Sequence, residues 1–264
     1  MEFLQGIEPI YVISGLVVGG LVGFTGVGGG SLMTPILILL FHIHPASAVG
    51  TDLLYASITK TAGSAVHGYN KNIDWSVVGR LALGSLPAAA LTIYLLYVLG
   101  VDSKPTQLLI TRVLGFALLL TAILLVFRPQ IMAFYEKHIG EPNPQTVAYL
   151  TVAVGFLLGV LVTISSVGAG AIGVTALVML YPKMPAHRIV GSDIVHAVPL
   201  TLIAGLGHSF LGTINLHVLF SLLLGSIPAI MIASYFSVKI PDRAIRMALA
   251  AVLLLVCMRF WFVS

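Results

Sequence analysis

Residues 23–30 read Gly-Phe-Thr-Gly-Val-Gly-Gly-Gly and interrupt an apolar run near the start of the chain. Residues 163–170, Thr-Ile-Ser-Ser-Val-Gly-Ala-Gly, interrupt a second apolar run in altered form. Glycine tolerates positive φ and carries no bulk, so both stretches are expected to break a helix and to bare its backbone. Inside a membrane such a backbone needs partners, which a ligand or a polar cavity supplies. The two glycine-rich breaks are therefore expected to line one substrate site.

The composition predicts a membrane protein with several spans. Of the 264 residues, 58% are hydrophobic and only 8% are charged, whereas a soluble domain carries about 25% charged residues. A single cysteine excludes an intrachain disulfide. The net charge of +4 is attributed to basic residues in cytoplasmic loops, not to a nucleic-acid partner.

Apolar segments of the length of a membrane span, roughly 20 residues, recur along the chain. They lie near 9–26, 46–69, 76–99, 106–127, 146–163, 187–210, 216–238 and 243–262. Two shorter apolar pieces, 31–42 and 171–181, directly follow the glycine-rich breaks and are expected to be half-helices or short helices. The polar stretch 128–145 is interpreted as a cytoplasmic linker with a short amphipathic surface helix over 131–138.

The two halves of the chain, 1–127 and 146–264, are interpreted as internal repeats. Gly191-Ser192-Asp193 lies 141 residues after Gly50-Thr51-Asp52, and the same spacing relates Gly225-Ser226-Ile227-Pro228 to an earlier Gly-Ser-Leu-Pro. The glycine-rich breaks are 140 residues apart. Matches at glycine, proline and polar positions do not follow from apolar composition alone.

The basic residues decide how many times each repeat crosses the membrane. If each short piece counts as a crossing, each repeat has five crossings and most basic side chains fall on one face. These are Lys71, Arg80, Arg128, Lys137, Lys183, Arg188, Lys239, Arg243 and Arg246. Four crossings would divide the basic residues almost evenly, so the positive-inside rule favours five. The fold class expected is thus an all-α polytopic protein of two inverted five-element repeats, with both termini outside, as in many secondary transporters.

A family resemblance rests on three pieces of sequence. Residues 26–30, Gly-Val-Gly-Gly-Gly, together with Pro35 and the Ala-Val-Gly-Thr of residues 48–51, resemble membrane proteins of the sulfite exporter TauE/SafE family. The resemblance covers essentially the whole chain. It implies a permease for sulfur-containing anions, such as sulfite or sulfonates, in the plasma (inner) membrane of a prokaryote. The family pattern usually has a small polar residue where this chain has Asp52 and Asp193, which raises the question of cation coupling.

The helices that follow the breaks are expected to turn their N-terminal N–H groups and positive dipole ends toward a substrate anion. Nearby hydroxyls and one basic side chain add donors. The candidate substrate-binding residues are Thr25, Gly26, Gly28, Gly29, Gly30, Ser31, Thr34, Lys60, Ser165, Ser166, Gly168, Ala169 and Gly170. The alternative is that the glycines only permit close helix packing.

Asp52 and Asp193 are candidates for binding a coupling proton or sodium ion. A carboxylate deep in a bilayer costs about 2.5–3.5 kcal/mol on insertion scales, so it is usually functional or paired. The alternative is that each helix begins one residue before its aspartate, which would then cap it. Pro45 and Pro185, a few residues upstream, keep this alternative open.

Other polar residues inside the expected spans have two interpretations each. Lys60 either attracts the anion or extends its stem to an interface. His67 and His208 match across the repeats, and either relay protons or lie at helix ends near the interface. His196 is deeper and is a candidate cavity-lining, coupling residue. No spacing of histidines resembles a metal site.

Three classes of function remain. The leading hypothesis is a secondary transporter of a small sulfur-containing anion that works by alternating access, without a cofactor. An anion channel of the same fold is the alternative. An intramembrane enzyme ranks last, because no nucleophile and base are suitably spaced. The glycine-rich stretches also lack the Lys-Ser/Thr of a P-loop, so this chain is not expected to use ATP.

Overall fold

Helices make up all the regular structure in the residues that the computed structural model describes, which are 8–25, 30–69, 72–138, 143–236 and 242–262. In the first half these helices are α2 (Pro9–Thr25), α3 (Gly30–Leu39), α4 (Pro45–Tyr69), α5 (Trp75–Leu99) and α6 (Lys104–His138). In the second half they are α7 (Pro144–Ser165), α8 (Ala171–Leu180), α9 (Ala186–Phe210), α10 (Leu216–Phe236) and α11 (Asp242–Phe262). The short apolar pieces expected after the two breaks are helices α3 and α8.

Five helical stretches of the described residues are long and apolar enough to cross a membrane. They are Trp75–Leu99, Lys104–Ile131, Pro144–Ser165, Ala186–Phe210 and Leu216–Ala233. Large apolar side chains lie on the outer surface of the bundle, among them Leu83, Leu157 and Leu255, which are 71%, 66% and 64% exposed. Such a surface suits lipid. The expectation of an all-α, multi-pass membrane protein is confirmed to this extent.

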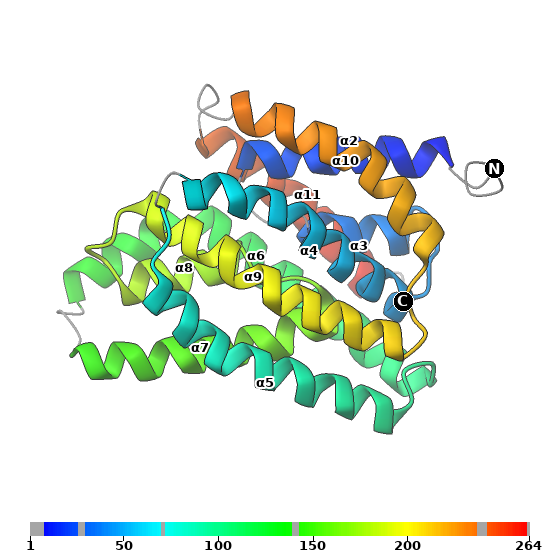
Figure 1. Ribbon diagram of the computed structural model, residues 1–264, viewed down its shortest axis with the longest axis horizontal. Coiled ribbons are helices and arrows are strands. Elements are labelled where there is room, and N and C mark those ends of the chain that lie inside the picture. The colour runs from blue at the N-terminus through cyan, green and yellow to red at the C-terminus, as the bar shows by residue number, and fades with distance from the viewer. Residues whose placement is uncertain (1–7, 26–29, 70–71, 139–142, 237–241, 263–264) are drawn as a thin grey trace.

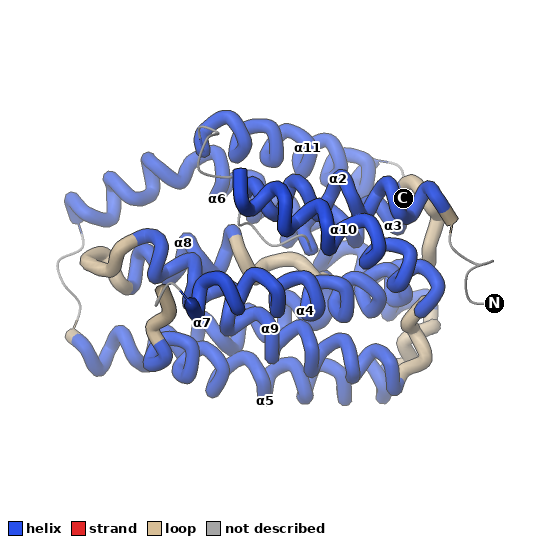
Figure 2. Tube along the Cα trace, turned by 45° about the horizontal axis from the view of Figure 1, so that its top comes forward, coloured by secondary structure: helices blue, strands red, loops and turns tan. Residues whose placement is uncertain are grey.

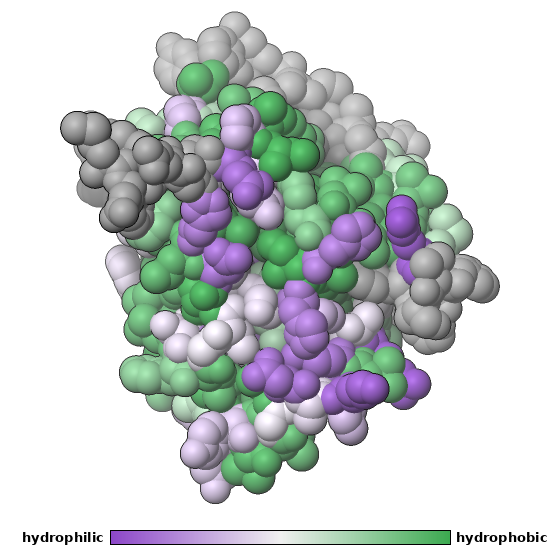
Figure 3. All heavy atoms as spheres, turned by 90° about the vertical axis from the view of Figure 1, so that its right-hand side faces the viewer, coloured by the Kyte–Doolittle hydropathy of each residue, from purple (hydrophilic) through white to green (hydrophobic). Residues whose placement is uncertain are grey.

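The helices run lengthwise through an elongated bundle (Figure 1). At the right-hand end of Figure 1, α2 begins and α11 ends; at the left-hand end, α6 ends and α7 begins. Figure 3 looks onto the right-hand end, where hydrophilic side chains cross the middle of the face and hydrophobic ones flank it. Polar ends and apolar sides are the distribution expected of a bundle whose long axis crosses a bilayer.

Helix α6 differs from the expected span, which was to end near residue 127. It continues without interruption to His138, so the surface helix expected over 131–138 is its extension. Pro129 lies inside this helix, where proline removes its own backbone hydrogen bond and kinks the helix or is accommodated by neighbouring groups. Residues 130–137 contain neither glycine nor a further proline, so their helix propensity favours continuation.

Two pairs of helices touch backbone to backbone because glycines recur every fourth residue. α2 packs along α10 through Gly15 and Gly19, and α7 packs along α5 through Gly155 and Gly159. A methyl group at Gly155 would collide with the carbonyl oxygen of Leu81 on α5. Glycine pairs with this spacing are typical of close helix packing in membranes. Close packing, the alternative interpretation of the glycine-rich breaks, therefore holds for these other glycines.

Helices α4 and α9 pack against each other in the middle of the bundle, where Figures 1 and 2 both place them side by side. Each half contributes one of the two. Because neighbouring helices cover them on several sides, their facing side chains are buried, including polar ones. Buried residues of this kind are Asp52 and Lys60 on α4, and Asp193 and His196 on α9.

Candidate functional site

The loop between α7 and α8 runs through the interior of the protein. Residues 166–170 are all buried. In Figure 2 one loop crosses the middle of the bundle, whereas the others lie at its two ends. Ser166, Gly168 and Gly170 have φ of 60°, 131° and 123°, and the last two values are readily adopted only by glycine. The second expected break is thus a buried, non-helical backbone that joins two helices.

The first break lies between the end of α2 at Thr25 and the start of α3 at Gly30. Three of the candidate residues, Gly26, Gly28 and Gly29, lie outside the described residues, as do the side chains of Thr25, Ser31 and His67. Thr34, on α3, is fully buried. It is the residue through which the region of the first break contacts the centre of the bundle.

Asp52 of α4 is fully buried and binds to the neighbouring short helix. Its Oδ2 accepts hydrogen bonds from the backbone N of Thr34, at 3.2 Å, and from the Thr34 hydroxyl, at 2.6 Å. The alternative that Asp52 caps its own helix is wrong, because α4 begins at Pro45. Asp52 instead places negative charge near the N-terminal part of α3, where the helix dipole favours it.

Asp193 of α9 is also buried, with 1% of its surface exposed. It is not a cap of its own helix either, because α9 begins at Ala186. Its Oδ1 lies against the backbone of Gly173 on α8, where an added methyl group would collide with it. The backbone of Gly170 also interacts with this carboxylate, yet Oδ1 has no hydrogen-bond partner. Both aspartates thus lie at the short helices whose N-terminal ends were expected to receive the anion.

Lys60 connects the two halves. Its side chain, from α4, is only 7% exposed, so its stem does not extend to a polar interface. The ammonium Nζ donates to the carbonyl oxygen of Ala169 in the buried loop, at 3.5 Å. Lys60 also interacts electrostatically with Asp193 and, less strongly, with Asp52. The basic residue of the first half therefore lies at the break of the second.

His196 and His208 have different surroundings, although both are fully buried. His196 Nε2 lies 2.8 Å from Ser85 Oγ on α5, and its Nδ1 has no partner. His208 uses both nitrogens: Nε2 is 3.0 Å from the Thr163 carbonyl oxygen and Nδ1 is 3.1 Å from Thr213 Oγ1. A carbonyl oxygen can only accept, so Nε2 of His208 carries a hydrogen. His208 ties the end of α9 to α7, whereas His196 keeps one nitrogen available.

The two serines of the break also differ. Ser165 Oγ donates to the Leu161 carbonyl oxygen at 2.7 Å and accepts from the Val167 backbone N at 3.2 Å, so it shapes the loop. Ser166 Oγ is buried and has no hydrogen-bond partner, although it lies near Asp52. Ser166 is thus a hydroxyl whose hydrogen-bonding capacity the protein does not use.

Unpartnered polar atoms gather at this centre. They are Asp52 Oδ1, Tyr55 Oη, Ser166 Oγ, Asp193 Oδ1, His196 Nδ1 and Ser226 Oγ. Folded proteins leave few buried polar groups without partners, and each such group calls for an explanation. Tyr55 and Ser226 occupy the positions that correspond to His196 and Ser85 at the repeat spacing of 141. The centre therefore offers both donors and acceptors to a small polar ligand.

Two further contacts, which the sequence analysis missed, join the halves at the ends of the bundle. The Ser192 hydroxyl accepts from the Asp74 backbone N at 2.8 Å, and the Thr51 hydroxyl accepts from the Asn215 backbone N at 3.0 Å. Both pairs have the repeat spacing, which is the signal that pointed to them. In each pair the hydroxyl residue immediately precedes one of the buried aspartates.

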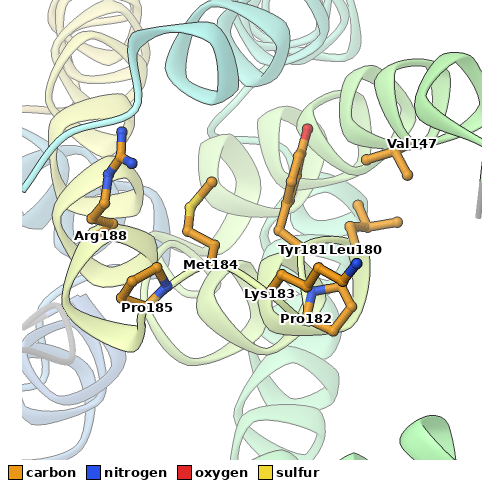
Figure 4. A pocket seen from close by; sticks show the side chains of 8 residues that line it. All are labelled: Val147, Leu180, Tyr181, Pro182, Lys183, Met184, Pro185 and Arg188. Carbon is orange, nitrogen blue, oxygen red and sulfur yellow. The ribbon is translucent and has the colours of Figure 1, made fainter. Parts of the chain in front are cut away.

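The end that carries the α6–α7 connection also holds basic side chains. A pocket of about 360 Å³ opens there between the end of α8 and the start of α9 (Figure 4). It is lined by Val147, Leu180, Tyr181, Pro182, Lys183, Met184, Pro185 and Arg188. Arg188 Nη2 lies 3.3 Å from Asp74 Oδ2, and Arg80 Nη1 donates to the Tyr181 hydroxyl at 3.2 Å. In the described part of the chain, no group of three or more acidic, histidine or cysteine side chains is arranged to hold a metal ion.

Comparison with known proteins gives one consistent picture. Residues 11–260 match the family model described as sulfite exporter TauE/SafE. The probable membrane transporter protein YjnA of Bacillus subtilis is 37% identical over 248 residues, covering 92% of this chain and 95% of the relative. A probable membrane transporter protein of Methanocaldococcus jannaschii is 29% identical over 210 residues, covering 78% and 73%. No solved structure matches the chain significantly.

Proposed function

This chain is a membrane transporter that belongs to the sulfite exporter TauE/SafE family, and we propose that it carries a small sulfur-containing anion, such as sulfite or an organosulfonate, as a secondary transporter. The match confirms the resemblance indicated by the glycine motifs. Under this proposal the chain lies in the plasma (inner) membrane of a prokaryote. A proton or a sodium ion is the candidate coupling ion.

The halves 1–127 and 146–264 are proposed to be inverted repeats. The arrangement of the chain supports this: the first half starts at one end of the bundle and finishes at the other, and the second half returns (Figure 1). Each half then crosses the membrane an odd number of times. The positive-inside rule assigns the end with Arg80, Lys183 and Arg188 to the cytoplasm and both termini to the outside.

The observation that carries the anion proposal is the buried ammonium of Lys60 at the carbonyl of Ala169. An uncompensated ammonium is costly in a bilayer, so it marks a site that a negative ligand can occupy. The Ser166 hydroxyl, which has no partner, lies in the same loop. An oxyanion accepts strong hydrogen bonds from an ammonium, a hydroxyl and backbone N–H groups together.

Alternating access requires that the centre be closed from each end in turn. The two repeat-related hydrogen bonds, Ser192 to Asp74 and Thr51 to Asn215, close opposite ends of the α4–α9 pair. We infer that the halves rock about the centre, so that one of these contacts opens while the other stays formed.

The experiment that tests the proposal is uptake into proteoliposomes of purified protein. Labelled sulfite, thiosulfate and methanesulfonate are compared with acetate, at two pH values, against liposomes without protein. Saturable uptake of at least one sulfur anion, with little uptake of acetate, is expected. No uptake of any sulfur anion above the protein-free level contradicts the proposed function, and uptake that does not saturate favours a channel.

A further inference from the structure

The two buried aspartates are related by the repeat, yet their surroundings differ at two positions. Asp52 receives two hydrogen bonds from Thr34. The residue that corresponds to Thr34 at the 140-residue spacing of the breaks is Val174, whose side chain has no donor. Asp193 consequently lies against the bare backbone of Gly173, with its Oδ1 unpartnered.

The second difference is the position of the ammonium. Lys60 follows Asp52 by eight residues, about 12 Å along the α4 axis, and interacts more strongly with Asp193 than with Asp52. Its counterpart at the repeat spacing is Thr201, whose hydroxyl donates to its own helix at the Ala197 carbonyl. Asp193 therefore has a cation as its main partner, whereas Asp52 has hydrogen bonds.

A substrate anion at Lys60 changes the charge balance around Asp193. Without the anion, one buried ammonium and one buried carboxylate compensate each other. Once the anion takes the ammonium as its partner, the carboxylate is a second negative charge in an apolar interior, which is strongly unfavourable. Neutralising that carboxylate removes the conflict.

We propose that Asp193 takes up one proton when the substrate anion binds at Lys60, so that the anion and the proton occupy the centre together. Asp52 keeps its charge and remains the fixed partner of α3. This inference rests on the proposed transport of an anion. It identifies which of the two aspartates is the coupling residue, and a proton as the ion that is coupled.

A proton fits this site better than a metal cation. A proton needs one oxygen lone pair, which the unpartnered Oδ1 supplies, whereas a metal cation needs several oxygen ligands. The Lys60 ammonium repels any additional cation that stays charged. The other charged or titratable groups near Asp193 are His196, one turn further along α9, and Asp52 on α4; α7 and α8 bring none to its level.

Coupling of this kind is reciprocal. If the anion raises the proton affinity of Asp193, protonation of Asp193 raises the affinity for the anion by the same factor. Asp193→Asn mimics the protonated carboxyl in size and neutrality. The variant is therefore expected to bind and carry the anion without responding to a pH gradient.

The first test measures the proton directly. Infrared difference spectra of the purified protein, recorded with and without thiosulfate or sulfite, are compared for the wild type, Asp193→Asn and Asp52→Asn. The carbonyl stretching band of a protonated carboxylic acid is expected on addition of the anion. It should be absent in Asp193→Asn and retained in Asp52→Asn. In Asp193→Glu, which keeps a carboxyl group, the band is expected at a shifted position.

The second test measures coupling in sodium-free proteoliposomes. An inward proton gradient is expected to drive accumulation of the anion by the wild type and by Asp52→Asn. Asp193→Asn should retain downhill flux and lose the accumulation. Anion flux in the wild type without a carboxylic band and without a response to the gradient overturns this inference and leaves the proposed function intact. Loss of band and coupling in Asp52→Asn alone overturns the assignment to Asp193, and absence of wild-type anion flux defeats the proposed function itself.

Discussion

The ammonium of Lys60, in the first half of the chain, lies 3.5 Å from the carbonyl oxygen of Ala169, in the glycine-rich break of the second. Neither half contains both groups, so the basic element of the centre forms only when the halves pack together. Both Lys60 and Ala169 are buried. This contact explains how a break that has no basic residue of its own can attract an anion.

Removal of the Lys60 charge is expected to impair anion uptake severely. A hydrogen bond to a charged group contributes about 1.5–3 kcal/mol, and about 1.4 kcal/mol corresponds to a factor of ten. Lys60→Gln should therefore raise the KM for the anion roughly tenfold to a hundredfold, as measured by proteoliposome uptake. Lys104→Gln is the matched control, because Lys104 is exposed at the start of α6. Equal KM values for the two variants would falsify the anion site at Lys60.

Gly173→Ala is expected to displace the Asp193 carboxylate. The new methyl group would collide with Asp193 Oδ1, and overpacking of this kind costs about 1–3 kcal/mol. Thermal unfolding in detergent should show a lower Tm, and Asp193→Ser introduced with it should recover part of the loss. Gly20→Ala on α2 is the control, because a methyl group there meets nothing within 4 Å. A Tm as high as that of the control contradicts the contact.

Gly155→Val is expected to separate α7 from α5. Its side chain would push against the Leu81 carbonyl, which leaves no room even for a methyl group. The expected outcome is a clear fall in Tm and in the yield of monodisperse protein in detergent. Gly79→Ala, on the open side of α5, should leave Tm unchanged or slightly raised, because alanine favours the helix. The idea of close packing fails if both variants unfold at the same temperature.

Asp74 has two roles that substitutions separate. Its carboxylate caps α5 by accepting from the backbone N of Ser76 and Val77, and it pairs with Arg188. Asp74→Asn keeps a good cap and loses the ion pair, so the change in stability should be below about 1 kcal/mol, as for partly exposed pairs. Asp74→Ala also loses the cap and should cost a further 0.5–2 kcal/mol or so. Equal stability of the two variants argues against the capping role.

The proposed topology places both chain termini outside the cell. A protease site or an epitope tag added before Met1 or after Ser264 should react in intact spheroplasts, whereas a tag in the 139–142 connection should react only after lysis. Accessibility of either terminal tag from the cytoplasm alone would contradict the inverted arrangement. A second tag on a known cytoplasmic protein reports that the membrane is intact.

Much of the fold was predictable from local properties of the chain. Apolar segment lengths placed the helices to within a few residues, and the Pro45 and Pro185 regions agree with the starts of α4 and α9. The extension of α6 to His138 was missed, because polarity was taken as the end of a helix when only the apolar span ended there. The four-residue glycine spacings in α2 and α7 were visible in the sequence and were not used.

The candidate site was predicted in its members more than in their connections. Asp52, Lys60, Asp193 and His196 were each singled out because polar residues inside apolar segments are rare, and all four are buried near one another. The hydrogen bonds of Asp52 to Thr34 were not foreseen, since a side chain's partner on another helix has no local signature. His208 was proposed as a proton relay, and both of its nitrogens hold α9 to neighbouring backbone and side-chain groups.

The sequence by itself determined the membrane environment, the duplication and the positions of the breaks, because composition, spacing and glycine content are properties of the chain before it folds. Only the tertiary structure decided which partner each buried polar residue has. The Lys60–Ala169 contact joins residues 109 positions apart and the His196–Ser85 contact joins residues 111 apart. Side chains so distant meet only through helix packing, and small departures from the repeat, such as Val174 in place of a threonine, then make two equivalent aspartates different.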